Sequence, residues 1–346
     1  MANEGGRYTP AMRLSPPILV IASLSIYLAS VVGENPKYSV IAKYKIGGEG
    51  GWDYLSVDHD SHRLFISRST HVMVMDTETG VLVGDIPNTP GVHGIALANK
   101  LNKGFTSNGR DNSVTVFDLK SLKELARVKV GTNPDAIVYE PQSNRVFTMN
   151  GRSSDATVID AKTDVVIGTI KLDGKPEFVV SDGKGFMYVN IEDKNEIQQF
   201  DINKLVVTKS WSIAPGDGPS GLAIDSKRHK LFSVCGNNMM VVSDYVAGKV
   251  IATPKIGSGP DAACYDPKMN LAFSSNGGDG TVTIVDGDNK PVTDISSQQS
   301  ARTMILDPVT HKLFLIAAEY SAPVAGSRRG TVVPGSASII VIGPSK

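Results

Sequence analysis

Short apolar runs separated by turn residues follow one another along almost the whole chain. A typical stretch carries four of them, at residues 136–139, 145–149, 156–159 and 165–170. They are rich in Val, Ile, Thr and aromatic residues, and Gly, Asn, Asp or Pro bounds them, which predicts β-strands joined by hairpin turns. No helical periodicity follows residue 33, so the pattern predicts an all-β protein.

The runs belong to a unit that is repeated seven times. One position of this unit recurs at spacings of 40, 42, 42, 43, 41 and 41 residues, and its occupants are Asp53, His93, Asp135, Glu177, Ser220, Asp261 and Arg302. A second position keeps the same register, at Asp76, Asp118, Asp160, Asp201, Asp244 and Asp286. Four strands per repeat of about 40–45 residues are typical of propeller blades, so we expect a seven-bladed β-propeller of four-stranded blades.

The two ends of the repeat array complement each other. The seventh repeat offers only three strands, at residues 303–306, 312–318 and 338–342, and an unmatched strand-like run lies at 38–46, before the first repeat. We therefore expect the N-terminal strand to complete the last blade, which removes an open sheet edge.

The N-terminal region has the features of a targeting segment. Residues 18–32 form a fifteen-residue uncharged apolar run behind Arg13, and Val31 and Gly33 fit the small −3 and −1 positions of a cleavage site before Glu34. This run is shorter than the ~20 residues that span a bilayer, and it is typical of a secretory signal. We predict a signal peptide at 1–33, a single propeller domain at 34–346 with no transmembrane span, and a periplasmic or secreted location; a retained N-terminal anchor is the alternative.

Composition narrows the choice of partners. Lys and Arg number 35 against 35 Asp and Glu, and this neutrality argues against nucleic acid as a partner, because such binding depends on clustered basic residues. The two cysteines, Cys235 and Cys264, cannot form a disulfide framework and are expected to be buried thiols, with a single disulfide as the alternative. We expect a monomer.

Several motifs recur at the ends of second strands and in the loops. They are the tetrapeptides ending in Asn at 105–108, 147–150, 187–190 and 273–276, and the Gly-x-x-Pro loops at 131–134 and 257–260. With these motifs the chain resembles the YVTN family of YncE-like β-propellers over essentially all of residues 34–346. The repeats that contain Arg68, Cys235 and Glu319 depart from the Asn motif, and the Trp-Asp of WD40 repeats is absent from its position. The resemblance implies the fold, but such propellers host several functions.

Polar residues are expected to gather at one face of the propeller. In a four-stranded blade, the loop entering the first strand and the loop between the second and third strands emerge on the same face, around the mouth of the central channel. Ionisable groups that converge on a concavity are the default binding site. The predicted ligand-binding residues are the aligned Asp53, His93, Asp135, Glu177, Ser220, Asp261 and Arg302, together with Arg68, Arg110 and Arg152 from the second loop, where Asn108, Asn150, Asn190, Glu192, Asn237, Asn276 and Asp279 also lie.

Three functions fit this face. The first is non-catalytic binding of a small molecule, a metal ion or a partner protein; the metal-ligand candidates are Asp53, Asp135, Glu177 and Asp261, which suit a hard divalent cation such as calcium. The second is a lactonase-like hydrolase with His93, Glu177 and Asp135 as catalytic candidates. The third is an accessory protein in a periplasmic redox system, for which no cofactor-attachment motif is present. The structural alternative is that these polar residues only cap strands around a water-filled channel.

Other suggestive sequences have simpler explanations. The run Asp58-His-Asp-Ser-His62 aligns with plain hairpin turns at 225–229 and 307–311, so we interpret it as a turn on the opposite face. The Gly-rich run at 216–221 leads into a strand instead of a helix, which excludes the dinucleotide-binding mechanism. The long loop at 320–337, with Arg328 and Arg329, is expected to project from the channel-mouth face.

Overall fold

The computed structural model describes residues 1–11, 37–322 and 330–345. The chain divides into two units, Met1–Asn35 and Pro36–Lys346. Residues 1–11 of the first unit are exposed and form no helix or strand. The predicted signal segment at 18–32 and the Arg328–Arg329 pair lie outside the described residues. Within the described ranges, no helix has the length and apolar character needed to cross a membrane.

The second unit consists of seven four-stranded antiparallel sheets, which confirms the predicted propeller. Each sheet is one blade, and consecutive strands of the chain are neighbours within it. From the inner to the outer strand, the first six blades are β2 (Leu55–Asp58), β3 (Arg63–Arg68), β4 (His71–Asp76), β5 (Leu82–Ile86); β6 (Val92–Ala98), β7 (Lys103–Asn108), β8 (Ser113–Asp118), β9 (Glu124–Lys129); β10 (Pro134–Glu140), β11 (Arg145–Asn150), β12 (Asp155–Asp160), β13 (Val165–Lys171); β14 (Pro176–Ser181), β15 (Phe186–Ile191), β16 (Glu196–Asp201), β17 (Val206–Ser212); β18 (Pro219–Asp225), β19 (Lys230–Cys235), β20 (Met239–Asp244), β21 (Lys249–Ala252); and β22 (Pro260–Asp266), β23 (Leu271–Asn276), β24 (Thr281–Asp286), β25 (Pro291–Ser296).

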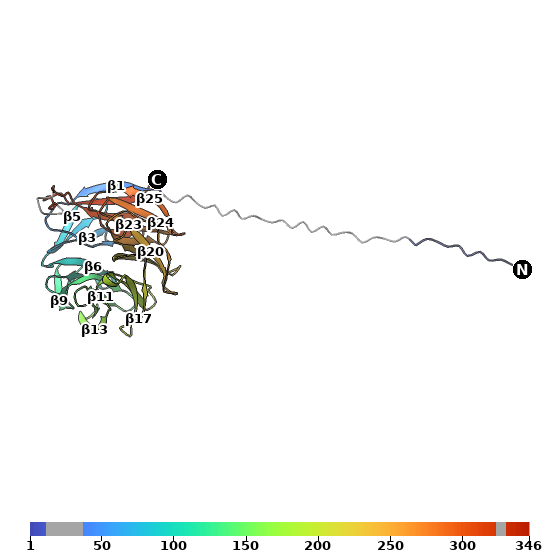
Figure 1. Ribbon diagram of the computed structural model, residues 1–346, viewed down its shortest axis with the longest axis horizontal. Coiled ribbons are helices and arrows are strands. Elements are labelled where there is room, and N and C mark those ends of the chain that lie inside the picture. Colours follow the sequence, from blue (N-terminus) through green and yellow to red (C-terminus); the bar gives the residue numbers. More distant parts are fainter. Residues whose placement is uncertain (12–36, 323–329, 346) are drawn as a thin grey trace. The chain divides into compact units, whose positions relative to one another are not determined.

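The seventh blade joins the two ends of the array, as predicted. Its strands are β26 (Thr303–Asp307), β27 (Lys312–Ala317), β28 (Ser338–Pro344) and, outermost, β1 (Tyr38–Lys45). Strand β1 pairs antiparallel with β28 from Tyr38 opposite Pro344 to Lys45 opposite Ser338. Figure 1 shows this N-terminal strand, in blue, beside strands from the C-terminal end. The inner strand β26 also contacts β2, so the circle of blades is closed.

Burial explains why the middle strands are continuous apolar runs. Strands β7 and β8 are buried at almost every position, because both faces of a blade pack against the neighbouring blades. Aromatic pairs such as Phe65 with Phe117, at a ring-centroid distance of 6.0 Å, fill the space between blades. The outer strands are mostly exposed, as in β13.

The repeated aspartates end the third strand of a blade and hold the following turn. Asp76 Oδ1 accepts hydrogen bonds from the backbone N–H groups of Glu78 and Thr79, at 3.1 and 2.8 Å. Asp160 does the same for the two residues that follow it by two and three positions, at 2.9 Å each. These bonds lower the pKa of both carboxyl groups. The aspartates that recur once per repeat therefore stabilise the turn after the third strand.

The histidines on the opposite face occupy turns, as predicted. His62, His229 and His311 each have positive φ, between 54° and 60°, in the hairpin between the first and second strands. Asn102, Asn144 and Asn270 have the same conformation at the aligned position of other blades. Because Asn and His tolerate the left-handed region better than most residues, backbone geometry accounts for these histidines.

The motif asparagines are buried and support the next strand. Asn108 Nδ2 donates to Ser113 Oγ and Thr115 Oγ1, at 3.1 and 2.9 Å, and its Oδ1 accepts from Thr106 Oγ1. Asn150 makes the corresponding bond to Thr157.

Both cysteines, Cys235 and Cys264, are buried and free, so the disulfide alternative is wrong.

Candidate functional site

The seven aligned residues lie at the start of the inner strands, so the propeller brings them to one end of the channel. The structure joins neighbouring members by ion pairs and hydrogen bonds. His93 Nδ1 is 2.7 Å from Asp53 Oδ2 and 3.7 Å from Asp135 Oδ1. These three residues come from blades 1, 2 and 3, and their side chains keep 16–29% of their surface exposed.

Basic side chains also pair with the other acidic members of the circle. Arg302 Nη1 pairs with Asp261, and its Nη2 lies 3.8 Å from Asp53 Oδ1. On the other side, Lys175 Nζ is 2.7 Å from Glu177 Oε1 and also pairs with Glu192. We call this set the channel ring: Asp53, His93, Asp135, Glu177, Asp261 and Arg302, with Lys175 attached. His93 and Arg302 each lie between two carboxylates, so part of the variety at the aligned position is explained by charge pairing, whereas Asp135 and Glu177 are neighbours of like charge.

Ser220 completes the aligned position in blade 5 and has a different environment. Its carbonyl oxygen accepts a hydrogen bond of 2.9 Å from Asn190 Nδ2. Its hydroxyl oxygen is buried without a hydrogen-bond partner among the described residues. Ser220 is thus placed beside the ring by the packing of blades 4 and 5.

A cavity of about 540 Å³ opens above one side of the channel ring. We call it the mouth cavity. Its charged and amide side chains are those of Asp53, His93, Arg110, Asn112, Asn133, Arg152 and Arg302. Arg110 and Arg152 are exposed, and neither takes part in an ion pair within the described residues. The mouth cavity therefore carries two guanidinium groups that have no acidic partner among the described residues. The other charged side chains that line it, Asp53, His93 and Arg302, are already paired within the channel ring.

Arg68 does not join this cavity. Its side chain is 1% exposed, and its guanidinium donates to the carbonyl oxygens of Gly47, Glu49 and Gly50 at 2.8, 3.0 and 3.1 Å. Burial lowers the pKa of this guanidinium. Arg68 holds the loop before β2 in position. The structure therefore gives this side chain a structural role, where the sequence predicted a ligand-binding residue. Asn108, Asn150, Asn190 and Asn276 are likewise fully buried.

Burial and mutual repulsion perturb the acidic members of the ring. Burial raises the pKa of Asp135 to about 6, and the Asp53 charge adds to the rise while His93 opposes it. Burial, followed by the charge of Asp135, raises the pKa of Glu177 to about 8. Asp261 is raised to a pKa of about 6 by burial, against the attraction of Arg302. Burial opposes protonation of His93, but the bond to Asp53 and the charge of Asp135 outweigh it and raise the His93 pKa.

These shifts predict that the folded protein loses stability as pH rises. A carboxyl group whose pKa is higher in the folded state than in the unfolded state binds more protons when the protein is folded. The free energy of unfolding therefore falls as the pH rises from the unfolded-state pKa to the folded-state pKa. For Glu177 this interval runs from its ordinary 4.5 to about 8. We expect the urea midpoint to fall from pH 5 to pH 8, and the Glu177→Gln variant to show a smaller fall. Glu78→Gln, in an exposed turn, is the control; an equal pH dependence in all three proteins would contradict the assignment.

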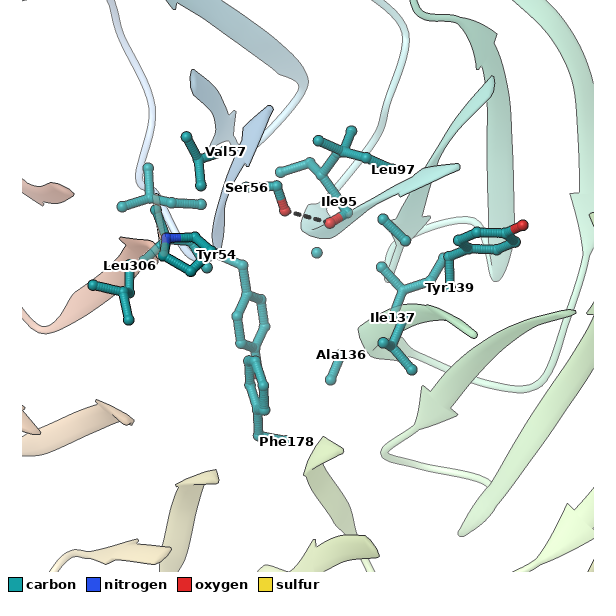
Figure 2. A pocket seen from close by; sticks show the side chains of 16 residues that line it. Tyr54, Ser56, Val57, Ile95, Leu97, Ala136, Ile137, Tyr139, Phe178 and Leu306 are labelled. Atoms are coloured by element: carbon teal, nitrogen blue, oxygen red, sulfur yellow. Dashed lines mark hydrogen bonds between the residues drawn. The ribbon is translucent and has the colours of Figure 1, made fainter. Parts of the chain in front are cut away.

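An aromatic contact crosses the channel directly beneath the ring. The rings of Tyr54, from blade 1, and Phe178, from blade 4, have centroids 5.4 Å apart at 45°. Figure 2 shows the two side chains pointing toward one another from opposite sides of the channel. Burial, and then the charges of Asp135, Asp53, Glu177 and Asp261, raise the Tyr54 pKa well above its ordinary value. The Tyr54 hydroxyl forms a side-chain hydrogen bond with Asp135. Two aromatic side chains therefore occupy the channel at this level.

Sequence reasoning missed this contact, although the repeats carry a signal for it. The position that follows the ring residue is aromatic in blades 1 and 4 and small in the others, where it holds Gly94, Ala136, Gly221, Ala262 and Thr303. Small residues are needed because adjacent inner strands approach closely: a Cβ on Gly221 would lie 2.6 Å from the backbone of Asp261 and Ala263. The two aromatic exceptions lie across the channel from each other.

Three ring residues could hold a metal ion. Asp53, His93 and Asp135 each offer a ligand atom within 4.8 Å of the others. One imidazole and two carboxylates suit a transition metal better than calcium, which takes oxygen ligands. The predicted calcium set also includes Glu177 and Asp261, and the structure pairs these with Lys175 and Arg302. A four-carboxylate site would require both pairs to break.

The fold and its polar mouth define the class of this molecule as a seven-bladed β-propeller with one candidate site at the end of the channel. Comparison with known families gives the finer assignment. A model of the YNCE-like beta-propeller matches residues 94–306, and the chain belongs to this family.

Other comparisons concern the fold alone. The structure is similar to a chain of the Kuenenia stuttgartiensis hydrazine synthase, with a TM-score of 0.68 and 18% sequence identity over 77% of this chain and 92% of that one. No curated protein sequence matches the chain.

Proposed function

We propose that this chain is an exported, non-catalytic binding protein whose mouth cavity takes a small organic anion. The observation that carries the proposal is the pair of exposed guanidinium groups, Arg110 and Arg152, on a cavity whose other charges are already paired. A planar guanidinium binds carboxylate or phosphate through two parallel hydrogen bonds. Export rests on the sequence alone, on the apolar run at 18–32 behind Arg13.

The remaining lining supports the same class of ligand. Asn112 and Asn133 come from the same blades as the two arginines and carry amide donors, although Asn112 Oδ1 accepts from the Asn133 backbone at 2.8 Å. His93 lines the cavity while its Nδ1 is held by Asp53. The volume of about 540 Å³ lies within the range of small-molecule sites.

Binding of simple anions tests the proposal. Succinate, citrate and malonate would each be titrated into the protein by calorimetry at low ionic strength. We expect at least one to bind, and the Arg110→Ala/Arg152→Ala variant to bind it at least tenfold more weakly, a loss of about 1.4 kcal/mol. The matched control is Lys184→Ala/Lys227→Ala, which removes two exposed positive charges from the β14–β15 and β18–β19 turns.

Two outcomes would overturn the assignment. One is the absence of binding for all three anions at millimolar concentration. The other is equal weakening in the mouth and control variants, because that would indicate only a change in overall charge.

One observation favours a hydrolase as the second candidate. The 2.7 Å contact between Asp53 Oδ2 and His93 Nδ1 is the arrangement that orients an imidazole as a general base, with Arg302 nearby to stabilise a developing oxyanion. The same protein would be assayed with aryl esters and lactones. Turnover that disappears in His93→Gln would replace the binding-only proposal with this one.

A further inference from the structure

A second cavity lies beneath the Tyr54–Phe178 contact, on the side away from the ring. It has a volume of about 340 Å³, and we call it the channel chamber. Residues that follow the ring position line it along the inner strands of blades 1, 2, 3, 4 and 7. Figure 2 shows Tyr54 and Phe178 together with Ile95, Leu97 and Ile137 around this space. No ring residue lines the chamber, and neither Tyr54 nor Phe178 lines the mouth cavity.

The side chains of the chamber offer an apolar environment. All of its lining residues are described, and none of them is charged. Only Ser56, Tyr54 and Tyr139 carry polar side-chain atoms. Ser56 Oγ donates to the carbonyl oxygen of Ile95, and Tyr139 Oη donates to Asn144 Oδ1 at 3.0 Å. The Tyr54 hydroxyl forms a side-chain hydrogen bond with Asp135 of the channel ring.

The polar side chains of the lining already have hydrogen-bond partners within the protein. The chamber is therefore expected to favour an apolar ligand. A sugar or a charged metabolite would lose its hydrogen bonds to water without gaining side-chain partners, which costs free energy. An apolar molecule would lose nothing by the same transfer. The apolar side chains of the chamber therefore favour an apolar ligand over a polar one.

Size and shape restrict the ligand further. A volume of about 340 Å³ is at the lower end of the range for small-molecule sites. The aromatic faces of Tyr54 and Phe178 close one end of the chamber, and such faces favour offset or edge-to-face contact with another ring.

We propose that the channel chamber is a second binding site, which takes one small uncharged aromatic molecule independently of the mouth cavity. This site does not depend on the proposed anion binding, because the Tyr54–Phe178 contact separates the two cavities. Its ligand enters from the face of the propeller opposite the mouth, where Pro308, in the turn after β26, belongs to the lining.

Fluorescence titration of the full chain with N-phenyl-1-naphthylamine, with naphthalene as competitor, tests the proposal. We expect saturable binding of one probe per chain that naphthalene displaces and succinate does not. Leu97→Glu should weaken probe binding at least tenfold, because it places a charge in the chamber. Val57→Phe should do the same by filling the space without a charge, so a folding defect in one variant does not decide the result.

The control addresses the exposed apolar residues of an outer strand. Val165, Val166 and Ile167 of β13 are 55, 39 and 43% exposed and could attract a hydrophobic probe. Val166→Glu should leave the probe affinity within twofold of the unaltered protein. Absence of saturable binding, unchanged affinity in both folded chamber variants, or a tenfold loss in Val166→Glu would overturn the proposal.

Discussion

Deletion of residues 38–45 should lower the melting temperature by on the order of 10 °C or more. This deletion removes β1, so the whole outer edge of β28 loses its hydrogen-bonded partner. It also removes Tyr38, which is 7% exposed and packs on Phe273 with a ring-centroid distance of 5.2 Å. Burial of one such side chain contributes about 1.5–3 kcal/mol, before the lost strand pairing is counted.

Thermal unfolding followed by circular dichroism measures this effect. Deletion of residues 2–11 is the control, because these residues form no strand and are exposed. The control should melt within 2 °C of the full chain, given the marginal contribution of unstructured termini to stability. Equal melting temperatures for both deletions would mean that β1 does not stabilise the closed circle of blades.

Replacement of Arg68 by Met should destabilise the protein by about 3 kcal/mol, although it keeps most of the side-chain volume. The variant leaves the carbonyl oxygens of Gly47, Glu49 and Gly50 without the guanidinium that binds them. The loop from Gly47 to Asp53 leads directly into the channel ring. Anion binding at the mouth should therefore weaken as well, through a change in the position of Asp53.

Arg110→Met is the matched control for Arg68→Met. Arg110 lies on the same face but is exposed, so its replacement should change the free energy of unfolding by less than about 0.5 kcal/mol. Urea denaturation measures both variants. If Arg110→Met proved as destabilising as Arg68→Met, the distinction between a buried support and an exposed ligand would be wrong.

These two arginines show where sequence reasoning reaches its limit. Both lie near the end of a second strand or in the loop that follows it, so the repeat register places both near the channel mouth. Nothing in the register reports that the loop at 47–50 folds over Arg68 and supplies three carbonyl oxygens. The exposure of Arg68 therefore depends on the loop at 47–50, which lies outside the aligned positions.

The channel ring illustrates the same limit for electrostatics. The aligned position was evident from spacing alone, and the sequence predicted that its members converge. Their pairing, with Arg302 between Asp261 and Asp53, and His93 between Asp53 and Asp135, required the order of blades around a closed circle. The contact between Asp53 and Arg302 joins residues 249 positions apart and exists only because blade 7 closes on blade 1.

By itself, the sequence determined the number of blades, the strand that closes them, the turn positions and the face on which polar residues gather. These properties follow from local rules: β-branched runs form strands, Asp and Asn hold turns, and one period repeats them. Only the tertiary structure decided which polar residues are free to bind and that Tyr54 and Phe178 divide the channel. Both depend on packing between blades far apart in the chain, where burial and charge neutralisation are set by neighbours that no local pattern specifies.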